Sequence, residues 1–278
     1  MKAMVLAAGL GTRLRPLTDD RPKALVEIAG RTLLEITLTR LRAFGVREVI
    51  INAHHLAGMI VEYLQANDNF GLRVEVSRED VLLDTGGGLK KTAHFFLKNT
   101  GGLDEPFILH NVDVISSIDL GRMVQFHAEN RALATLAVQE RDSSRYLLFD
   151  EQLRLCGRRT SEAEIDELAR SGRSLIPRQT QAGASANGAF PLAGAEPGRL
   201  PGTPLRALGF CGIHVISSRL FAMMPEKNIF SIIACYLQLA ARGERIHGFP
   251  ADEYYWRDLG TPESVRKAAE DLQKGVLR

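Results

Sequence analysis

The sequence predicts an α/β fold with a mostly parallel, mixed central sheet, and three observations carry this prediction. The first half of the 278-residue chain alternates short apolar runs with amphipathic helical runs, which is the rhythm of consecutive βαβ units. Hydrophobic residues make up 45% of the chain and charged residues 24%, a globular composition able to bury a sizeable core. A glycine-rich turn follows the first apolar run, at the kind of strand end where open α/β sheets bind ligands.

Alternating strands and helices are expected up to residue 140. Residues 3–8 form the first strand. The segment RTLLEITLTRLRAFG, residues 31–45, places its leucines on one face of a helix and ends at Gly45, a residue that favours helix ends. The run GGGLKKTAHFFLK, residues 86–98, predicts a helix that starts after a glycine turn. The other strands are expected at 48–53, 72–79, 106–114 and 133–140, and the other helices at 56–67 and 120–130.

Residues 160–204 break this rhythm. They are polar at first and then rich in Gly, Ala and Pro, with too few large apolar side chains to offset the entropy lost on ordering. We therefore expect a polar, flexible insertion or lid within a single domain that spans residues 1–278.

Regular structure is expected again after this segment. A strand at 206–217 and a helix at 231–243 lead to a final strand, turn and helix over 254–275. The start of the last helix is well marked by its N-cap, its first residue and a first-turn acid, which are Thr261, Pro262 and Glu263.

Composition and charge narrow the classes of function. An aromatic content of 6% argues against a base-stacking nucleic-acid surface. With a net charge of only +2, any preference for anions has to come from local clusters of cations. No apolar stretch approaches the ~20 residues that span a bilayer, and the short N-terminal apolar run predicts a strand rather than a signal peptide. Cys156, Cys211 and Cys235 lack CxxC spacing and lie beside apolar residues, so we expect buried thiols and a reducing, cytoplasmic location.

The stretch LAAGLGTRLRPLTDDRPKAL, residues 6–25, fits neither familiar phosphate loop. A dinucleotide loop needs a third glycine where Leu14 stands, and a Walker A loop needs a Gly-Lys-Ser/Thr triplet, which the chain lacks. What remains is a turn at Gly9 and Gly11 whose backbone N–H groups can approach an anion. Four cations follow it, Arg13, Arg15, Arg21 and Lys23. Guanidinium forks and a compact ammonium suit phosphate oxygens, so this stretch predicts a polyphosphate site.

The same stretch resembles the G-x-G-T-R-L-x-P-L-T-x-x-x-P-K-x-L motif of the sugar-1-phosphate nucleotidyltransferases, also called nucleoside-diphosphate-sugar pyrophosphorylases. The matching residues are Gly9, Gly11, Thr12, Arg13, Pro16, Leu17, Thr18, Pro22, Lys23 and Leu25. LLDTGGGLKK, ILHNVDV, FCGIHVIS and WRDLGTPESV are similar to later segments of that family. The resemblance covers nearly the whole chain except residues 160–204, and it implies a three-layer, Rossmann-like nucleotidyltransferase domain.

Within the family, the chain looks most like N-acetylmuramate-1-phosphate uridylyltransferases and mannose- or heptose-1-phosphate guanylyltransferases. Two departures leave the sugar open. Val112 replaces a family glycine and is expected to crowd the sugar side. The acidic-Lys-Pro segment, whose lysine commonly meets the sugar phosphate in the family, has no match after Leu153, and Arg158 and Arg159 stand nearby instead. The chain stops after its last helix, so a fused hexapeptide-repeat acetyltransferase is not expected.

The resemblance implies transfer of a nucleotidyl group from a nucleoside triphosphate to a sugar-1-phosphate, with Mg²⁺ as cofactor. UTP and GTP are the expected donors, neither a nucleic acid nor a membrane is an expected partner, and a homo-oligomer is allowed. The implied catalytic residues are Arg13, Lys23, Asp113 and Asp258, of which the two aspartates hold the metal. The implied nucleotide-binding residues are Leu6, Ala7, Ala8, Gly9, Gly11, Thr12, Arg13, Thr85, Gly86 and Gly87. The implied substrate-binding residues are Lys23, Asn111 and Gly212.

Two alternatives stay open at this level. A non-catalytic regulatory subunit could keep the fold and bind a nucleotide sugar, but it would not need the two cations and both metal carboxylates together. A guanylyl- or cytidylyltransferase acting on a non-sugar phosphate, such as molybdopterin, would share the loop but not the WRDLGTPE turn. A buried packing role is expected for His110, and no role is assigned to the His54–His55 pair.

Overall fold

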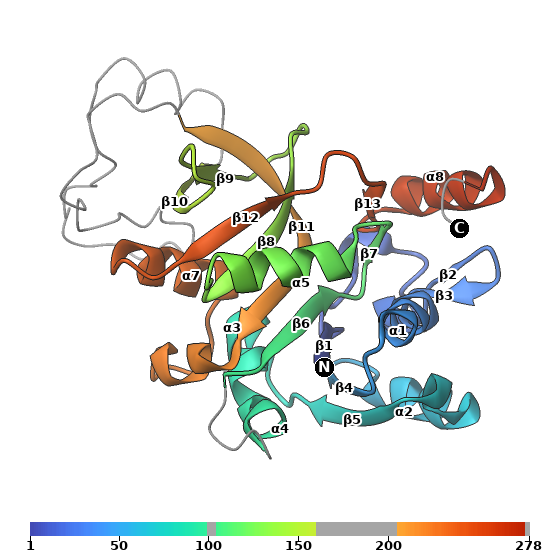
Figure 1. Cartoon of the computed structure of the whole chain (residues 1–278). Coiled ribbons are helices and arrows are strands. Elements are labelled where there is room, and N and C mark those ends of the chain that lie inside the picture. The colour runs from blue at the N-terminus through green and yellow to red at the C-terminus, as the bar shows by residue number, and fades with distance from the viewer. Residues whose placement is uncertain (99–103, 160–204, 276–278) are drawn as a thin grey trace, which may run out of the picture.

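The computed structural model describes residues 1–98, 104–159 and 205–275 (Figure 1). The predicted insertion or lid at 160–204 lies outside these residues.

A nine-stranded mixed sheet forms the centre of the molecule, with the strand order β10-β9-β11-β6-β1-β4-β5 and with β8 joining β11 to β12. Strands β6, β1, β4 and β5 are parallel, whereas β11 runs antiparallel to β6, β8 and β9. The strands are β1 (Lys2–Leu6), β4 (Glu48–Ala53), β5 (Arg73–Arg78), β6 (Pro106–Asn111), β8 (Ala134–Gln139), β9 (Tyr146–Phe149), β10 (Leu155–Arg159), β11 (Arg206–Ser217) and β12 (Ile246–Pro250).

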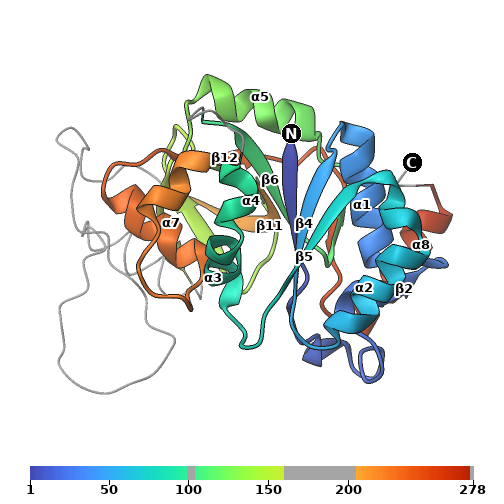
Figure 2. The same ribbon diagram turned by 90° about the horizontal axis from the view of Figure 1, so that it is seen from below.

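Helices cover both faces of the sheet, which confirms the three-layer α/β fold (Figure 2). One core lies beneath α1 (Leu33–Phe44), α2 (Ala57–Ala66), α5 (Leu120–Glu129) and α8 (Pro262–Gln273). The other lies beneath α3 (Asp84–Lys91), α4 (Ala93–Leu97) and α7 (Ile232–Ala241). Two small ribbons stand apart from the main sheet, β2 (Glu27–Ile28) with β3 (Arg31–Thr32) and β7 (Val114–Ser116) with β13 (Trp256–Asp258).

Local signals explain the ends of the best-predicted helices. The hydroxyl of Thr32 accepts from the Glu35 amide at 3.0 Å and caps α1, and Gly45 ends that helix as expected. At α8, Thr261 and Ser264 form a reciprocal capping box, which confirms Thr261 as the N-cap.

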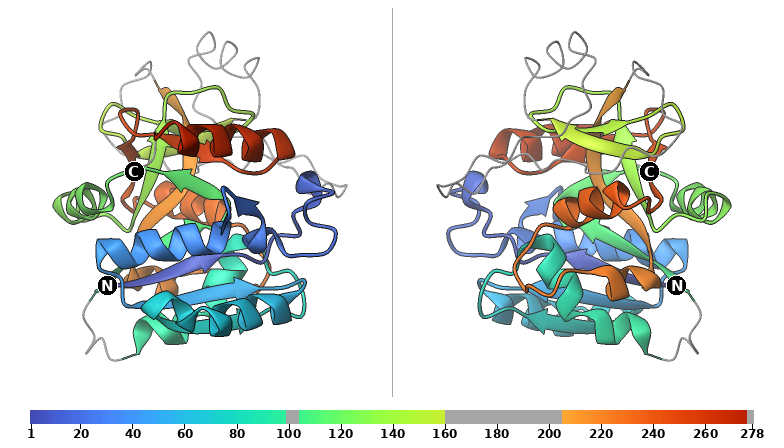
Figure 3. Two further views of the ribbon diagram at one scale, coloured as in Figure 1. Left: turned by 90° about the vertical axis from the view of Figure 1, so that its right-hand side faces the viewer. Right: turned by 90° about the vertical axis from the view of Figure 1, so that its left-hand side faces the viewer.

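The long strand β11, orange in Figure 3, pairs with two different strands along one of its edges. Residues Ile213–Ser217 pair with β6, and Arg206–Gly209 pair with β9 on the same edge of β11. Strand β8 takes the opposite edge, where the register shifts between Phe210 and His214. Along the described chain, the edge facing β6 and β9 has no ladder partner between Gly209 and Ile213. The hairpin β9–β10 therefore stands beyond the C-terminal end of β6.

Several expectations about elements were wrong. Gly86, Gly87 and Gly88 lie inside α3 rather than in a turn before it. Glycine is needed there because the 228–230 segment packs where side chains of Gly86 and Gly87 would be, and polar side chains at the ends of β4 and β5 pack where that of Gly88 would be. The expected strand 106–114 breaks at Val112–Asp113 to make a turn before β7. Cys156 is half-buried, unlike buried Cys211 and Cys235. The short strands β9, β10 and β12 were not predicted at all.

Among the described residues, no helix combines the length and the apolar content needed to cross a bilayer.

Four buried histidines make the folded state sensitive to acid. Burial lowers the pKa of His110 and His214 to about 3 and that of His127 and His247 to about 4. The folded protein keeps these rings neutral, whereas the unfolded chain protonates them below pH ~6.5. Their contribution to the free energy of unfolding is therefore complete above pH 6.5 and falls as the pH drops towards 4, by about 1.4 kcal/mol per pH unit for each ring.

We expect urea unfolding between pH 7 and pH 4.5 to report this loss. Replacing His247 by Phe should flatten the slope, since neither ring nitrogen of His247 has a hydrogen-bond partner. Stability that stays level between pH 6.5 and pH 4.5 would contradict the assignment.

Candidate active site

The loop after β1 folds back on itself at Gly11. This residue has a φ of 66°, a left-handed conformation that favours glycine, and a Cβ there would lie 3.0 Å from Thr18 Cγ2 and 3.3 Å from Lys23 Cβ. The Thr18 hydroxyl donates to the Gly11 carbonyl at 2.9 Å. Leu14, which stands where a dinucleotide loop has glycine, is fully buried and anchors the loop in the core. The fold of the loop therefore fixes the position of the Lys23 stem.

Lys23 forms an ion pair with Asp113, which lies in the turn between β6 and β7. Their side chains are only 12% and 17% exposed, so the pair is largely shielded from solvent. This contact joins the glycine loop to the C-terminal end of β6.

The pairing of β13 with β7 brings the second predicted metal ligand to the same place. Asp258 pairs with Val114, and the Leu259 amide donates to the Asp113 carbonyl at 2.8 Å. Burial and then the negative charge of Asp113 raise the pKa of Asp258, while the charges of Lys23 and Arg13 act in the opposite direction.

Gly260 gives Arg13 its place beside Asp258. A Cβ on Gly260 would lie 2.6 Å from Asp258 Oδ1 and 2.9 Å from Arg13 Nη2, so any larger residue would displace one of these groups. The Gly260 amide also donates to Asp258 Oδ1 at 2.9 Å. The structure thus brings together all four residues predicted to be catalytic, from the loop after β1, the turn after β6 and strand β13, while their roles stay predictions.

This cluster has the donor set of a Mg²⁺ site. Mg²⁺ prefers oxygen ligands and is commonly held by one or two carboxylates together with substrate phosphates and water. Asp113 and Asp258 supply two carboxylates, and within the described ranges no group of three or more His, Cys, Asp or Glu residues could hold a metal without such help. The residues therefore fit a metal shared with a phosphate ligand.

The second glycine segment is tied to the start of α7. The Ile232 amide donates to the Thr85 hydroxyl at 3.0 Å, and the amides of Gly86 and Gly87 both donate to the Phe230 carbonyl, at 2.9 and 3.2 Å. These groups are thus engaged within the protein, and contact of Thr85, Gly86 and Gly87 with a nucleotide stays a prediction. The same holds for the first segment, in which Gly9 and Thr12 are exposed beyond the end of β1.

A buried network that the sequence reasoning missed holds the first segment in place. Asn52, at the end of β4, accepts from the Ala7 amide at 2.8 Å and donates to Glu79 at 2.7 Å. The other oxygen of Glu79 accepts from the Leu83 amide at 3.1 Å, and Glu79 is only 4% exposed. In the sequence, the signal was a polar residue, Asn52, near the end of the apolar strand β4. Its partners, Ala7 and Glu79, could be identified only from the fold.

Asn111 and Gly212 lie side by side where β6 and β11 meet. Gly212 has a φ of 74°, and a Cβ there would come within 2.9 Å of Asn111 Nδ2. The side chain of Val112 is buried in the core, and the expected crowding of the sugar side stays a prediction.

The expected packing role of His110 is confirmed. Its Nε2 lies 3.2 Å from Arg40 Nη1 and its Nδ1 2.7 Å from the Asn111 carbonyl. Arginine can only donate, so Nε2 accepts and Nδ1 carries the proton. Sequence reasoning did not single out Arg40, which also donates to Ser116 at 2.9 Å beneath the Asp113 turn.

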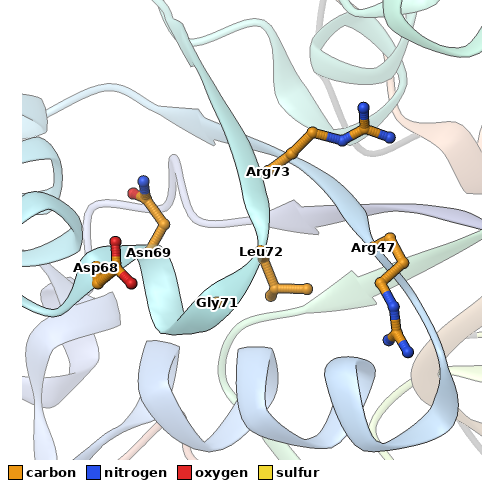
Figure 4. A pocket seen from close by; sticks show the side chains of 6 residues that line it. All are labelled: Arg47, Asp68, Asn69, Gly71, Leu72 and Arg73. Atoms are coloured by element: carbon orange, nitrogen blue, oxygen red, sulfur yellow. The ribbon is translucent and has the colours of Figure 1, made fainter.

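An open groove lies at the opposite edge of the sheet (Figure 4). Its lining residues surround the N-terminal ends of β4 and β5 and are Arg47, Asp68, Asn69, Gly71, Leu72 and Arg73. The cluster around Asp113 is at the C-terminal edge, so this groove is not part of it.

Comparison with known proteins identifies the family. Residues 2–150 match the family model described as nucleotidyl transferase. The chain is 32% identical over 271 residues to an N-acetylmuramate alpha-1-phosphate uridylyltransferase of Caulobacter vibrioides, covering 96% of this chain and 95% of the relative. The chain belongs to the nucleotidyl transferase family. The family predicted from the glycine loop is thereby confirmed.

Other matches agree with this membership. A mannose-1-phosphate guanylyltransferase of Mycobacterium tuberculosis is 28% identical over 276 residues, which cover 99% of this chain and 65% of that one. The crystal structure of HddC from Yersinia pseudotuberculosis has a TM-score of 0.68 at 20% identity and covers 98% of this chain and 99% of its own. An apo UDP-glucose pyrophosphorylase has a TM-score of 0.70 at 16% identity, over 99% of both chains. The structural matches support the fold alone.

The effect of neighbouring charges on the pKa of Asp258 can be measured by titrating labelled carboxyl carbons by NMR. Asp113→Asn should lower the pKa of Asp258, because a neighbouring negative charge is removed. Lys23→Met should raise it, because a neighbouring positive charge is removed. Asp142→Asn, at an exposed position, serves as the control. An Asp258 pKa that neither Asp113→Asn nor Lys23→Met moves would show that these groups do not act on one another.

Proposed function

We propose that the protein transfers a nucleotidyl group from UTP or GTP to a sugar-1-phosphate, giving a nucleoside-diphosphate sugar and pyrophosphate. The observation that carries this proposal is the meeting of Arg13, Lys23, Asp113 and Asp258 at the C-terminal edge of the sheet. Family membership supports it, as do the uridylyl- and guanylyltransferase names of the relatives.

The proposed chemistry matches the groups present. An oxygen of the sugar phosphate bonds to the α-phosphorus, and the bond from that phosphorus to the bridging oxygen of pyrophosphate breaks. The attacking phosphate is already ionised, so the site has to position and neutralise charge rather than remove a proton. Arg13 and Lys23 would neutralise the phosphate oxygens of the donor.

Mg²⁺ would be held by Asp113 and Asp258, the two carboxylates that converge in the cluster. When bound, the ion supplies positive charge to the phosphate oxygens. A binding-only subunit would have no use for a second carboxylate, Asp113, whose charge disfavours the ionisation of Asp258, so their proximity favours the catalytic function over that alternative.

An assay of pyrophosphate release tests the proposal over the widest range of substrates. The purified protein should release pyrophosphate with UTP or GTP in a matrix that also includes dTTP and CTP, each against a panel of sugar-1-phosphates. Release should require both substrates and Mg²⁺. No release from any combination would overturn the proposed function.

Arg13 is expected to act mainly in the transition state, since negative charge builds on the leaving pyrophosphate. Arg13→Ala should lower kcat about 100-fold, the loss expected for one preorganised donor. Arg15→Ala is the matched control, because the Arg15 side chain is 70% exposed and pairs with Asp19 at 3.4 Å. A mutant with normal kcat and only a raised KM would assign Arg13 to ground-state binding.

A further inference from the structure

Arg159, the last residue of β10, is a buried cation that forms no ion pair or hydrogen bond with the residues that the structure describes. It is 4% exposed, and neither Nε nor Nη1 has a hydrogen-bond partner. Its guanidinium carbon lies 4.6 Å from the centre of the Tyr146 ring. Burying charged donors without hydrogen bonds is costly, so such a group needs an explanation, and a negatively charged ligand would supply one.

Arg159 shares one face of the sheet with other site-forming groups. It pairs with Tyr146 across β10 and β9, and Tyr146 pairs with Gly209 across β9 and β11. Directly paired residues project to the same face. The side chain of Arg141 covers Gly209 on that face, with its Cζ 2.9 Å from where a Cβ would be. Arg158 is one residue earlier in β10 and projects to the opposite face.

Arg141 connects this face to the Asp113–Asp258 cluster. Its guanidinium stacks on Trp256 at 3.9 Å from the ring centre and donates to the Phe210 carbonyl at 2.8 Å, while its buried Nε has no partner. Trp256 donates to the Cys211 carbonyl at 2.7 Å and precedes Asp258 by two residues on β13. Two arginines with unused donors therefore lie on the hairpin side of the metal-binding carboxylates.

The separation along β11 between the Asn111–Gly212 contact and the Tyr146–Gly209 pair suits a substituted sugar ring. Asn111 ends β6 beside Gly212, and Tyr146 begins β9 opposite Gly209. Gly209 and Gly212 are three residue steps apart on β11, which is about 10 Å at ~3.3 Å per residue. A phosphate held near Asp113 would leave the far side of its sugar near Tyr146 and Arg159.

We propose that Arg159, assisted by Arg141, binds a carboxylate carried by the sugar ring, so that the acceptor is an acidic sugar-1-phosphate. This inference rests on the proposed function. A planar guanidinium fork matches a carboxylate, and the 1-phosphate itself belongs near Lys23 and Asp113, on segments separate from the β9–β10 hairpin. The acidic substituent would supply the partner that the buried guanidinium lacks.

Paired ligands test this subsite by calorimetry, independently of turnover. N-acetylmuramic acid 1-phosphate differs from N-acetylglucosamine 1-phosphate by a lactyl carboxylate, and glucuronic acid 1-phosphate differs from glucose 1-phosphate by a carboxylate at C6. With Mg²⁺ and a non-hydrolysable UTP or GTP analogue present, the wild type should bind the acidic member of at least one pair ten-fold or more tightly. Arg159→Met should bring that ratio close to one, and Arg158→Met should keep it.

A second readout separates ligand binding from a structural role. Removing an unpaired buried charge should leave the melting temperature of the ligand-free protein unchanged or raise it. An Arg159→Met protein that melts at a much lower temperature would overturn the inference, and so would equal wild-type affinity for the two members of both ligand pairs.

If Arg159→Met weakens the binding of the acidic and the neutral member of a pair equally, Arg159 binds the 1-phosphate and the inference is wrong. Arg159→Lys, which keeps the charge but loses the fork, should give an intermediate ratio. If no pyrophosphate is released but the affinity ratios are as expected, the proposed function is wrong and the carboxylate-binding subsite still stands.

Discussion

The ion pair of Lys23 with Asp113 is the contact on which the site depends. It fastens the loop after β1 to the turn after β6, two segments ninety residues apart. Without a cation at this point, the carboxylates of Asp113 and Asp258 would face each other in a partly buried space, where like charges repel strongly. The backbone bond from Leu259 to Asp113 and the β7–β13 pairing hold the second carboxylate there. Strand pairing thus maintains an arrangement that electrostatics alone would disfavour.

Two other features near the C-terminal edge of the sheet suit the binding of a ligand better than the stability of the ligand-free protein. Gly260 keeps the space between Arg13 and Asp258 open, and Arg159 is a buried cation whose Nε and Nη1 find no hydrogen-bond partner among the described residues. Each feature costs folding free energy in the ligand-free protein and fits a negatively charged ligand. The opposite edge differs, since Arg73 there has an acidic partner, Glu48, at 2.9 Å. The distribution of unsatisfied charge therefore coincides with the site proposed from chemistry.

Sequence reasoning succeeded where local signals decide the structure. Thr261 and Gly45 mark helix ends by their own chemistry, and the glycine loop carries enough matched residues to predict its family. It failed where distant segments decide. Glycine is needed at position 87 because the Asn228 carbonyl lies 1.9 Å from where a Cβ would be, and the Asn52 network needs partners from two other segments. Short strands such as β9 carry too few residues to show a period.

The central claim is that Asp113 and Asp258 act as one unit on a shared metal, and a double-mutant cycle tests it most directly. Turnover with Mg²⁺ is compared among wild type, Asp113→Asn, Asp258→Asn and the double mutant. If the pair is one unit, each single change abolishes metal-dependent turnover and the double mutant is scarcely worse. Near-normal turnover in either single mutant, or losses that multiply in the double mutant, would contradict the claim.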